Sequence, residues 1–280
     1  MSDSLISRLK QAWKDRPRRR RVIVTDVTRM DGTRVCVGGY LEDGGAVRPV
    51  VGRSGPDETW LQRASDGPVA PFSVVELRIA GAPKGMHAPH TEDRLTPNRG
   101  QRVRRVLKTP EQIALLERTC SPAVRDIFGA EIHADANGTW GRYVLTGQGG
   151  CSLGTIKPVE IEEVVYRRYA DRGRWDYRLR FRDGAHEAYQ LAVVDLAFRR
   201  QLDTLRDRGM SPEAAADAMR EGLRGQQVYL RVGLARGWDK HPDRCYLQLT
   251  GVYGFAQAGQ TESSVSGQVS GARAPTTLSL

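Results

Sequence analysis

The chain has 280 residues and a mass of 31.1 kDa, which is enough for two small domains or one large one. Its formal net charge of +10 at pH 7 favours an anionic partner, and nucleic acid is the commonest such partner of a soluble protein. The four cysteines are scattered, so the sequence indicates neither a zinc knuckle nor a disulfide scaffold. No long apolar run opens the chain, and we therefore expect a cytoplasmic protein without a secretory signal or a membrane span.

Residues 1–21 are expected to form an amphipathic helix followed by a basic arm. Leu5, Leu9 and Trp13 recur at helical spacing, and the segment RPRRRR occupies residues 16–21. Two interpretations of this segment stay open: a flexible arm that binds phosphates, and a charged block that is only solvated. The arginines assigned to nucleic-acid binding under the first interpretation are Arg18, Arg19, Arg20 and Arg21.

Residues 22–107 show mainly strand signals. The short apolar segments are VIVTDV, VCVGGYL, AVRPVV and FSVVELRIAG, and the intervening EDGG at residues 42–45 is typical of a hairpin turn. PDETWLQRA predicts one helical turn. Several short strands with a single brief helix favour a small barrel. Residues 108–138 then form a helical linker, in which Thr109 and Ser121 are expected to begin two short helices.

Residues 139–256 predict a second barrel with inserted helices. Strand candidates precede and follow two helices that begin at Asp195 and Ser211. Strands, then helices, then two more strands is the order of the five-stranded OB barrel, whose helix lies between the third and fourth strands. We thus predict a mainly β protein with α insertions (α+β), in which short helices join two OB-like barrels. The Gly/Ser/Thr/Gln-rich residues 257–280 are expected to be a disordered tail.

Several stretches, in order along the chain, resemble a known family. They are VIVTDVTRM, RVCVGGY and AVRPV in the first half, and APHTEDR, SLGTIKP, YLRVGLARGW and RCYLQLTGVYGF later. These stretches, over roughly residues 20–256, resemble the dual OB-containing domain family of bacteria. The resemblance implies two fused OB folds and nucleic-acid binding, often in mobile or anti-phage settings, without established catalytic residues. The sequence departs from the family's pattern after GFAQAGQ, where low-complexity sequence replaces an apolar or aromatic ending.

Two segments contain residue types that serve catalysis in other proteins. The loop MHAPHTEDR combines residues that suit a metal ion, namely His87, His90, Glu92 and Asp93. It lacks a known ligand spacing, and the favoured interpretation is a loop fixed by hydrogen bonds of His90 and Asp93. GQGGCSLGTIK at residues 147–157 has glycines at P-loop spacing but no lysine for the phosphates, so its glycines indicate tight turns or a close approach. We expect no enzymatic activity, no metal and no cofactor.

The segment RWDYRLRFR alternates between large apolar and charged residues, which predicts a strand with one buried face. A hairpin with EIEEVVYRRY would place Arg178 over Tyr166 and leave Arg180, opposite Val164, without a partner. Its large apolar side chains are expected in the core. The arginine face is either the solvated side of the sheet or a track for phosphates, with Tyr166, Arg178 and Arg180 as its binding residues.

The loop ARGWDKHPDR between the last two strands provides the most specific binding candidates. In OB barrels this loop and the face of strands 2 and 3 belong to the usual binding site. Trp238 offers a flat surface on which a base can stack, and Arg236 and Lys240 flank it with positive charge. The alternative is that Trp238 folds back and closes the end of the barrel.

These features predict a non-catalytic protein that binds nucleic acid. Single-stranded DNA or RNA is favoured, because OB grooves combine basic residues with aromatic ones. The resemblance adds a bacterial defence or DNA-processing system as the setting. One alternative is an adaptor that binds a protein partner in a defence or repair complex, and another is an enzyme whose site the sequence does not reveal.

Overall fold

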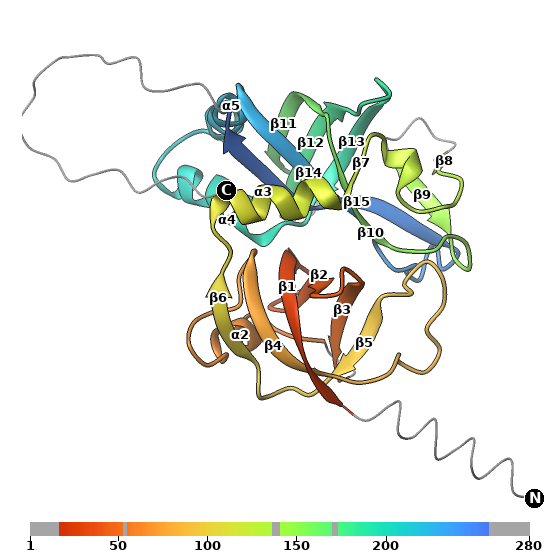
Figure 1. The fold of residues 1–280 in the computed structure, drawn as a ribbon. Helices are drawn as coiled ribbons and strands as arrows, with labels where there is room; N and C mark the ends of the chain where they lie inside the picture. The colour runs from red at the N-terminus through yellow and green to blue at the C-terminus, as the bar shows by residue number, and fades with distance from the viewer. Residues whose placement is uncertain (1–16, 53–54, 136–140, 170–172, 258–280) are drawn as a thin grey trace, which may run out of the picture.

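The computed structural model describes residues 17–52, 55–135, 141–169 and 173–257, which form two β barrels packed against each other (Figure 1). The first barrel is red to yellow in Figure 1 and the second is green to blue. The predicted mainly β architecture with helical insertions is confirmed. No helix within the described ranges is long and apolar enough to cross a membrane. The predicted N-terminal helix, and nearly all of the predicted disordered tail, lie outside these ranges.

Six strands and one short helix make up the first barrel. Their bounds are β1 (Arg18–Arg29), β2 (Val35–Leu41), β3 (Ala46–Val51), α2 (Glu58–Gln62), β4 (Ser73–Ile79), β5 (Asp93–Thr96) and β6 (Arg102–Val106). β1 pairs antiparallel with β2 and β4, and β3 pairs parallel with β5. The barrel closes beside β5, where the Thr96 hydroxyl donates to the Arg78 carbonyl. β1 to β5 close the barrel with α2 between the third and fourth strands, which is the OB architecture, and β6 adds a strand beside β4.

The core of the first barrel follows from the alternation of side chains along its strands. Val22 and Val24 of β1 point inward and are fully buried. Trp60 of α2 joins the same core. Asp57 fixes the start of that helix, because its carboxylate accepts the Trp60 N–H at 2.8 Å. The predicted helical turn and the predicted hairpin at residues 42–45 are therefore confirmed.

The first four residues of β1 correct the prediction of a flexible arm. Arg18, Arg19, Arg20 and Arg21 pair with β4, so the strand begins four residues earlier than predicted. Ladder hydrogen bonds to β4 hold their backbone, while all four side chains are exposed. Residue 16 and those before it lie outside the described ranges.

Short elements connect the barrels. Their bounds are α3 (Thr109–Arg118), β7 (Cys120–Ser121), η1 (Val124–Asp126), β8 (His133–Ala134) and β9 (Arg142–Leu145). α3 starts with Lys108 as its N-cap, one residue before the predicted Thr109. The second predicted helix is only the 3₁₀ turn η1. Leu115 and Leu116 of α3 pack against aromatic residues of both barrels, so this helix is part of their junction (Figure 1).

The second barrel repeats the OB pattern with a divided first strand. Its elements are β10 (Leu153–Ile156), β11 (Glu160–Arg168), β12 (Trp175–Arg182), β13 (Ala188–Val193), α4 (Leu196–Asp207), α5 (Pro212–Leu223), β14 (Gln226–Leu234) and β15 (Arg244–Ala256). β10 pairs with β14 and β11 with β12, as the two halves of β1 pair with β4 and β2. Pro158, which has no N–H for the ladder, lies at the division. β13 pairs parallel with β15, as β3 does with β5.

The helices α4 and α5 lie between β13 and β14, as the sequence predicts. The Asp195 carboxylate accepts the Ala197 N–H at 2.8 Å, and the Ser211 hydroxyl accepts the Ala214 N–H at 3.1 Å. Gly209 ends the first helix with a φ of +96°. α5 packs against β11, on the outside of the barrel.

Candidate nucleic-acid interface

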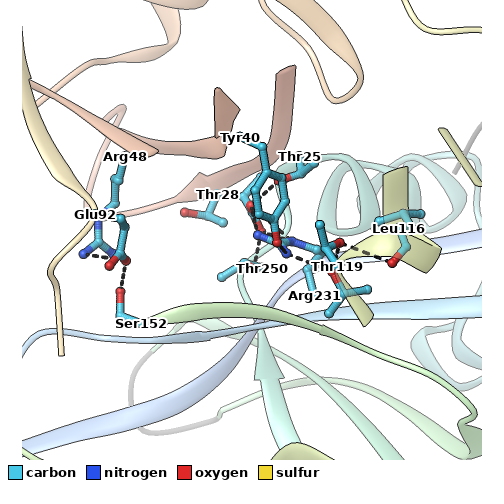
Figure 2. Close-up of polar contacts among 12 residues, drawn as sticks. Thr25, Thr28, Tyr40, Arg48, Glu92, Leu116, Thr119, Ser152, Arg231 and Thr250 are labelled. Carbon is cyan, nitrogen blue, oxygen red and sulfur yellow. Dashed lines mark hydrogen bonds and ion pairs between the residues drawn. The ribbon is translucent and has the colours of Figure 1, made fainter. Parts of the chain in front are cut away.

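A buried ion pair joins the two barrels. Arg231 of β14 donates to the Asp26 carboxylate of β1, at 2.8 Å from Nη2 and 3.1 Å from Nε. The same guanidinium donates to the Tyr40 hydroxyl of β2 at 2.7 Å and to the Thr155 hydroxyl of β10 at 2.9 Å. Figure 2 shows Arg231 beside Tyr40 and Thr250. Both charges are buried and each is compensated by the other barrel, so a shift of one barrel that breaks the pair while it stays buried is costly, and the contact fixes how the barrels are placed.

Both members of this pair keep their charge. Burial raises the pKa of Asp26, but Arg231 and hydrogen bonds from Thr250 and Thr25 outweigh that effect and hold the pKa below its usual value. Burial lowers the pKa of Arg231, but Asp26 and Tyr40 outweigh it and raise this pKa above its usual range. The junction therefore contains a true ion pair at neutral pH.

A second polar contact between the barrels is centred on Asp93. Arg48 of β3 donates through Nε to one Asp93 oxygen at 2.6 Å and through Nη2 to His90 Nδ1 at 2.7 Å. Arg236, in the loop between β14 and β15, donates to the other Asp93 oxygen. Ser152 adds a hydrogen bond to Glu92, which Figure 2 shows beside Arg48. The second barrel thus holds the loop that precedes β5.

A groove of about 890 Å³ runs along this junction. The first barrel contributes the β1–β2 loop and the outer faces of β2 and β3. The second barrel contributes the β14–β15 loop, the start of β12 and part of β15. The face of strands 2 and 3 with its neighbouring loops is where OB barrels usually bind oligonucleotides. In this chain the corresponding face of the first barrel is covered in part by the loops of the second.

Arginines dominate the charged lining of the groove. Two carboxylates line it, Asp26 and Asp31, against six arginines. The arginines are Arg29, Arg34, Arg48, Arg174, Arg199 and Arg236. Such an excess of guanidinium groups in a hollow favours anionic ligands.

The arginines of the groove differ in their ion pairs with neighbouring carboxylates. Arg48 is buried with its carboxylate partners, and Arg29 pairs with Glu58 at 2.5 Å. Arg34 is 45% exposed and lies 3.6 Å from the exposed Asp31. Such a weak contact leaves the Arg34 guanidinium able to bind another anion.

Arg199 is a half-buried cation of the groove wall. Its Nε donates to the Val193 carbonyl at 2.6 Å, and its guanidinium lies 4.8 Å from the centre of the Tyr177 ring. Among the described residues no carboxylate forms an ion pair with it. Burial lowers the pKa of Arg199. An anion in the groove would therefore find a positive charge that is incompletely compensated.

Two exposed apolar side chains face the groove from opposite barrels. Met30 of the β1–β2 loop is 46% exposed, and Trp238 of the β14–β15 loop is 50% exposed. Trp238 forms a backbone bridge with His241, and Lys240 lies 5.8 Å from the centre of its ring. Trp238 does not fold back into the barrel. Trp238 and Met30 thus offer an aromatic face and a thioether to a ligand.

The structure distributes the residues that the sequence suggested for binding over several places. Trp238 and Arg236 lie in the groove, with Lys240 beside them. Arg18, Arg19, Arg20 and Arg21 lie at the other end of β1 and do not line the groove. Arg178 and Arg180 lie on β12, outside the lining. The groove therefore brings together only part of the predicted set.

The predicted β11–β12 hairpin is confirmed, but its register is wrong by one residue. The Tyr169 N–H donates to the Arg174 carbonyl, so the hairpin closes one residue earlier than predicted. A shift of one residue moves side chains to the opposite face of a sheet. Tyr166 therefore lies opposite Tyr177 in the core, 3% exposed, and cannot stack on a ligand beside Arg178.

The arginine side of β12 is largely compensated by carboxylates. Arg178 donates to Asp176 at 3.1 Å, and Arg180 and Arg182 both pair with Glu162, at 2.7 Å and 2.6 Å. The prediction that Arg180 has no partner is wrong, because the Glu162 side chain reaches it. These pairs favour the interpretation that the arginine side of β12 is the solvated side of the sheet over the interpretation that it is a track for phosphates.

The histidine loop and the glycine segment have structural roles. His90 and Asp93 hold Arg48 by hydrogen bonds, which confirms the favoured interpretation of the loop. Within the part of the chain that the structure describes, no three metal-binding side chains converge. Gly147 and Gly149 adopt φ of +88° and +86°, and a Cβ on Gly149 would meet the Phe128 carbonyl at 2.8 Å.

Among the groove residues that sequence reasoning did not assign to the site are Met30, Arg34, Arg174 and Arg199. A signal existed for the first two, because they lie in the loop between the first two strands of a predicted OB barrel. Arg199 lies on α4, four residues after the cap Asp195, and nothing in the sequence links that position to the first barrel.

The fold and the groove define a protein of two fused OB barrels with one shared cleft. The chain belongs to the dual OB-containing domain family, whose model matches residues 20–252. No curated protein and no solved structure matches the chain.

Proposed function

We propose that the protein binds nucleic acid in the groove between its barrels, with single strands preferred, and carries out no chemistry on it. The observation that carries this proposal is the position of the groove, because it covers the oligonucleotide-binding face of the first barrel. OB folds commonly bind nucleic acid in this way. The family resemblance supports a bacterial defence or DNA-processing complex as the setting.

The apolar groups of the groove support a preference for unpaired bases. A base stacks on an aromatic ring only when its face is free, and Trp238 is half exposed at the groove. Met30 on the opposite barrel offers a second, adaptable apolar surface. DNA and RNA both satisfy these contacts.

The arginines of the groove support binding to the phosphate backbone. Arg34 and Arg174 are exposed, and Arg199 has no ion pair among the described residues. Each guanidinium that neutralises a phosphate releases a counterion, so binding should weaken steeply with salt.

Fluorescence anisotropy with single- and double-stranded DNA and RNA tests the proposal. The groove variant is Arg34→Gln/Arg174→Gln/Trp238→Ala, and the control is Arg125→Gln/Arg224→Gln, whose arginines are exposed and away from the groove. We expect tight single-strand binding by the native protein and the control, and at least tenfold weaker binding by the groove variant. Equal binding by all three proteins would refute the proposal, and binding of a protein partner alone would favour the adaptor alternative.

A further inference from the structure

The outer face of β1, β4 and β6 carries a second concentration of arginines, here called the arginine face. Its members are Arg19, Arg21, Arg78, Arg102, Arg104 and Arg105. None of them lines the groove. Arg21 and Arg29 of the groove are eight positions apart on β1, which is about 26 Å along a strand. The two basic regions are therefore distinct.

The strand pairing brings these arginines side by side. Arg19 lies opposite Arg78, and Arg21 lies opposite Glu76. Glu76 accepts from Arg19 at 2.5 Å and from Arg104 at 2.5 Å. One carboxylate thus serves two guanidinium groups on neighbouring strands.

Carboxylates compensate the arginine face only in part. The ion-pair partners of these six arginines are Glu42, Asp66, Glu76 and Glu111. Arg78 has no carboxylate partner among the residues that the structure describes. The paired arginines stay accessible: Arg19 is 68% and Arg21 53% exposed. Solvent-exposed ion pairs are weak, so phosphates can replace the carboxylates.

The arginine face lacks the groups that bind unpaired bases. β1, β4 and β6 contain no aromatic residue. A hollow of about 290 Å³ is lined by three arginines, one carboxylate and two apolar side chains: Arg21, Arg104, Arg105, Glu42, Ile23 and Val74. Guanidinium groups around a hollow without a stacking ring suit phosphate oxygens and give no base readout.

We propose that the arginine face binds the phosphate backbone of duplex nucleic acid, independently of sequence. The inference rests on the proposed function in one respect, the choice of nucleic acid as the polyanion. It adds a second site with a different preference. A protein that holds a single strand in the groove and a duplex on the arginine face is suited to junctions between the two.

A variant of the arginine face and a matched control variant test this proposal. The arginine-face variant is Arg19→Gln/Arg21→Gln/Arg104→Gln, and the matched control is Arg125→Gln/Arg208→Gln/Arg224→Gln, which removes the same charge from exposed positions elsewhere. Glutamine keeps most of the side-chain length and the hydrogen-bonding capacity at Glu76. Thermal unfolding of each variant establishes that it is folded.

Binding is measured with a 25-base-pair duplex and with a short single strand over a range of salt concentrations. We expect the arginine-face variant to bind the duplex at least tenfold more weakly, with a salt slope reduced by about 0.9 for each phosphate that the variant no longer neutralises. Its single-strand affinity should stay within twofold of the native value. Duplex binding that is unchanged, or that falls equally in the control, would overturn the proposal. Failure of the groove proposal is distinguishable from this outcome, because the groove variant would then bind the single strand as tightly as the native protein does.

Discussion

Arg231 donates to Asp26 across 205 positions of sequence, and this buried pair places the second barrel against the β2–β3 face of the first. Tyr40 and Thr155 accept both donors of Nη1 of the same guanidinium, so the contact has little freedom to shift. The width of the groove therefore depends on this buried contact.

Asp26→Asn should destabilise the protein by about 3–5 kcal/mol, because it leaves the Arg231 charge buried without its partner. Urea unfolding measures this loss. Asp31→Asn, a change of the same chemistry at an 89% exposed position nearby, should change the free energy of unfolding by less than about 0.5 kcal/mol. Equal effects of the two changes would show that the pair does not hold the barrels together.

Acid should destabilise the protein through His90. Burial, with the nearby charges of Arg48 and Arg236, lowers its pKa from 6.5 to about 3. Between these values the unfolded chain binds a proton that the folded protein excludes, so stability falls as the pH drops through this window. The loss approaches about 1.4 kcal/mol per pH unit.

His90→Gln should flatten the dependence of the unfolding free energy on pH between 6.5 and 4, since glutamine does not titrate. His87→Gln is the matched control, because His87 is exposed in the same loop. If both variants keep the pH dependence of the native protein, His90 is not the group responsible for it.

Trp238→Ala should weaken single-strand binding about 5- to 150-fold, the equivalent of about 1–3 kcal/mol for the loss of one stacked base. The melting temperature should stay the same, because the ring is half exposed. Anisotropy and thermal unfolding measure the two effects. A variant with a lowered melting temperature and full affinity would instead show a structural role for the ring.

Arg34→Gln/Arg174→Gln should reduce the salt slope of single-strand binding by about 0.7 for each phosphate that these side chains neutralise in the native complex. Both arginines line the groove, Arg34 just before β2 and Arg174 just before β12. A titration from 50 to 300 mM salt measures the slope. If affinity falls while the slope stays constant, these arginines act through packing and not through binding of phosphates.

Local signals predicted most of the fold. Asp195 and Ser211 begin their helices where the sequence places them, because a side-chain oxygen beside free N–H groups is a short-range cause of helix initiation. The β1 start was missed, since four consecutive arginines carry no apolar alternation and only their pairing with β4 makes them a strand.

The site was predictable only in part. The proposed role of Trp238 follows from its loop within an OB barrel, and the exposure of its side chain agrees with that hypothesis. Tyr166 was misplaced because one residue of hairpin register decides which face a side chain occupies. Arg199 joins the groove only because distant residues dock the two barrels, and no local pattern encodes that contact.

Photo-crosslinking tests the central claim most directly. A single-stranded oligonucleotide with 5-iodouracil at each position in turn is irradiated with the native protein, and mass spectrometry maps the attachment sites. We expect crosslinks in the β14–β15 loop, foremost at Trp238, and in the β1–β2 loop around Met30, with loss of the former in Trp238→Ala. Crosslinks confined to α5 or to the outer face of β12, with neither loop modified, would contradict binding in the groove.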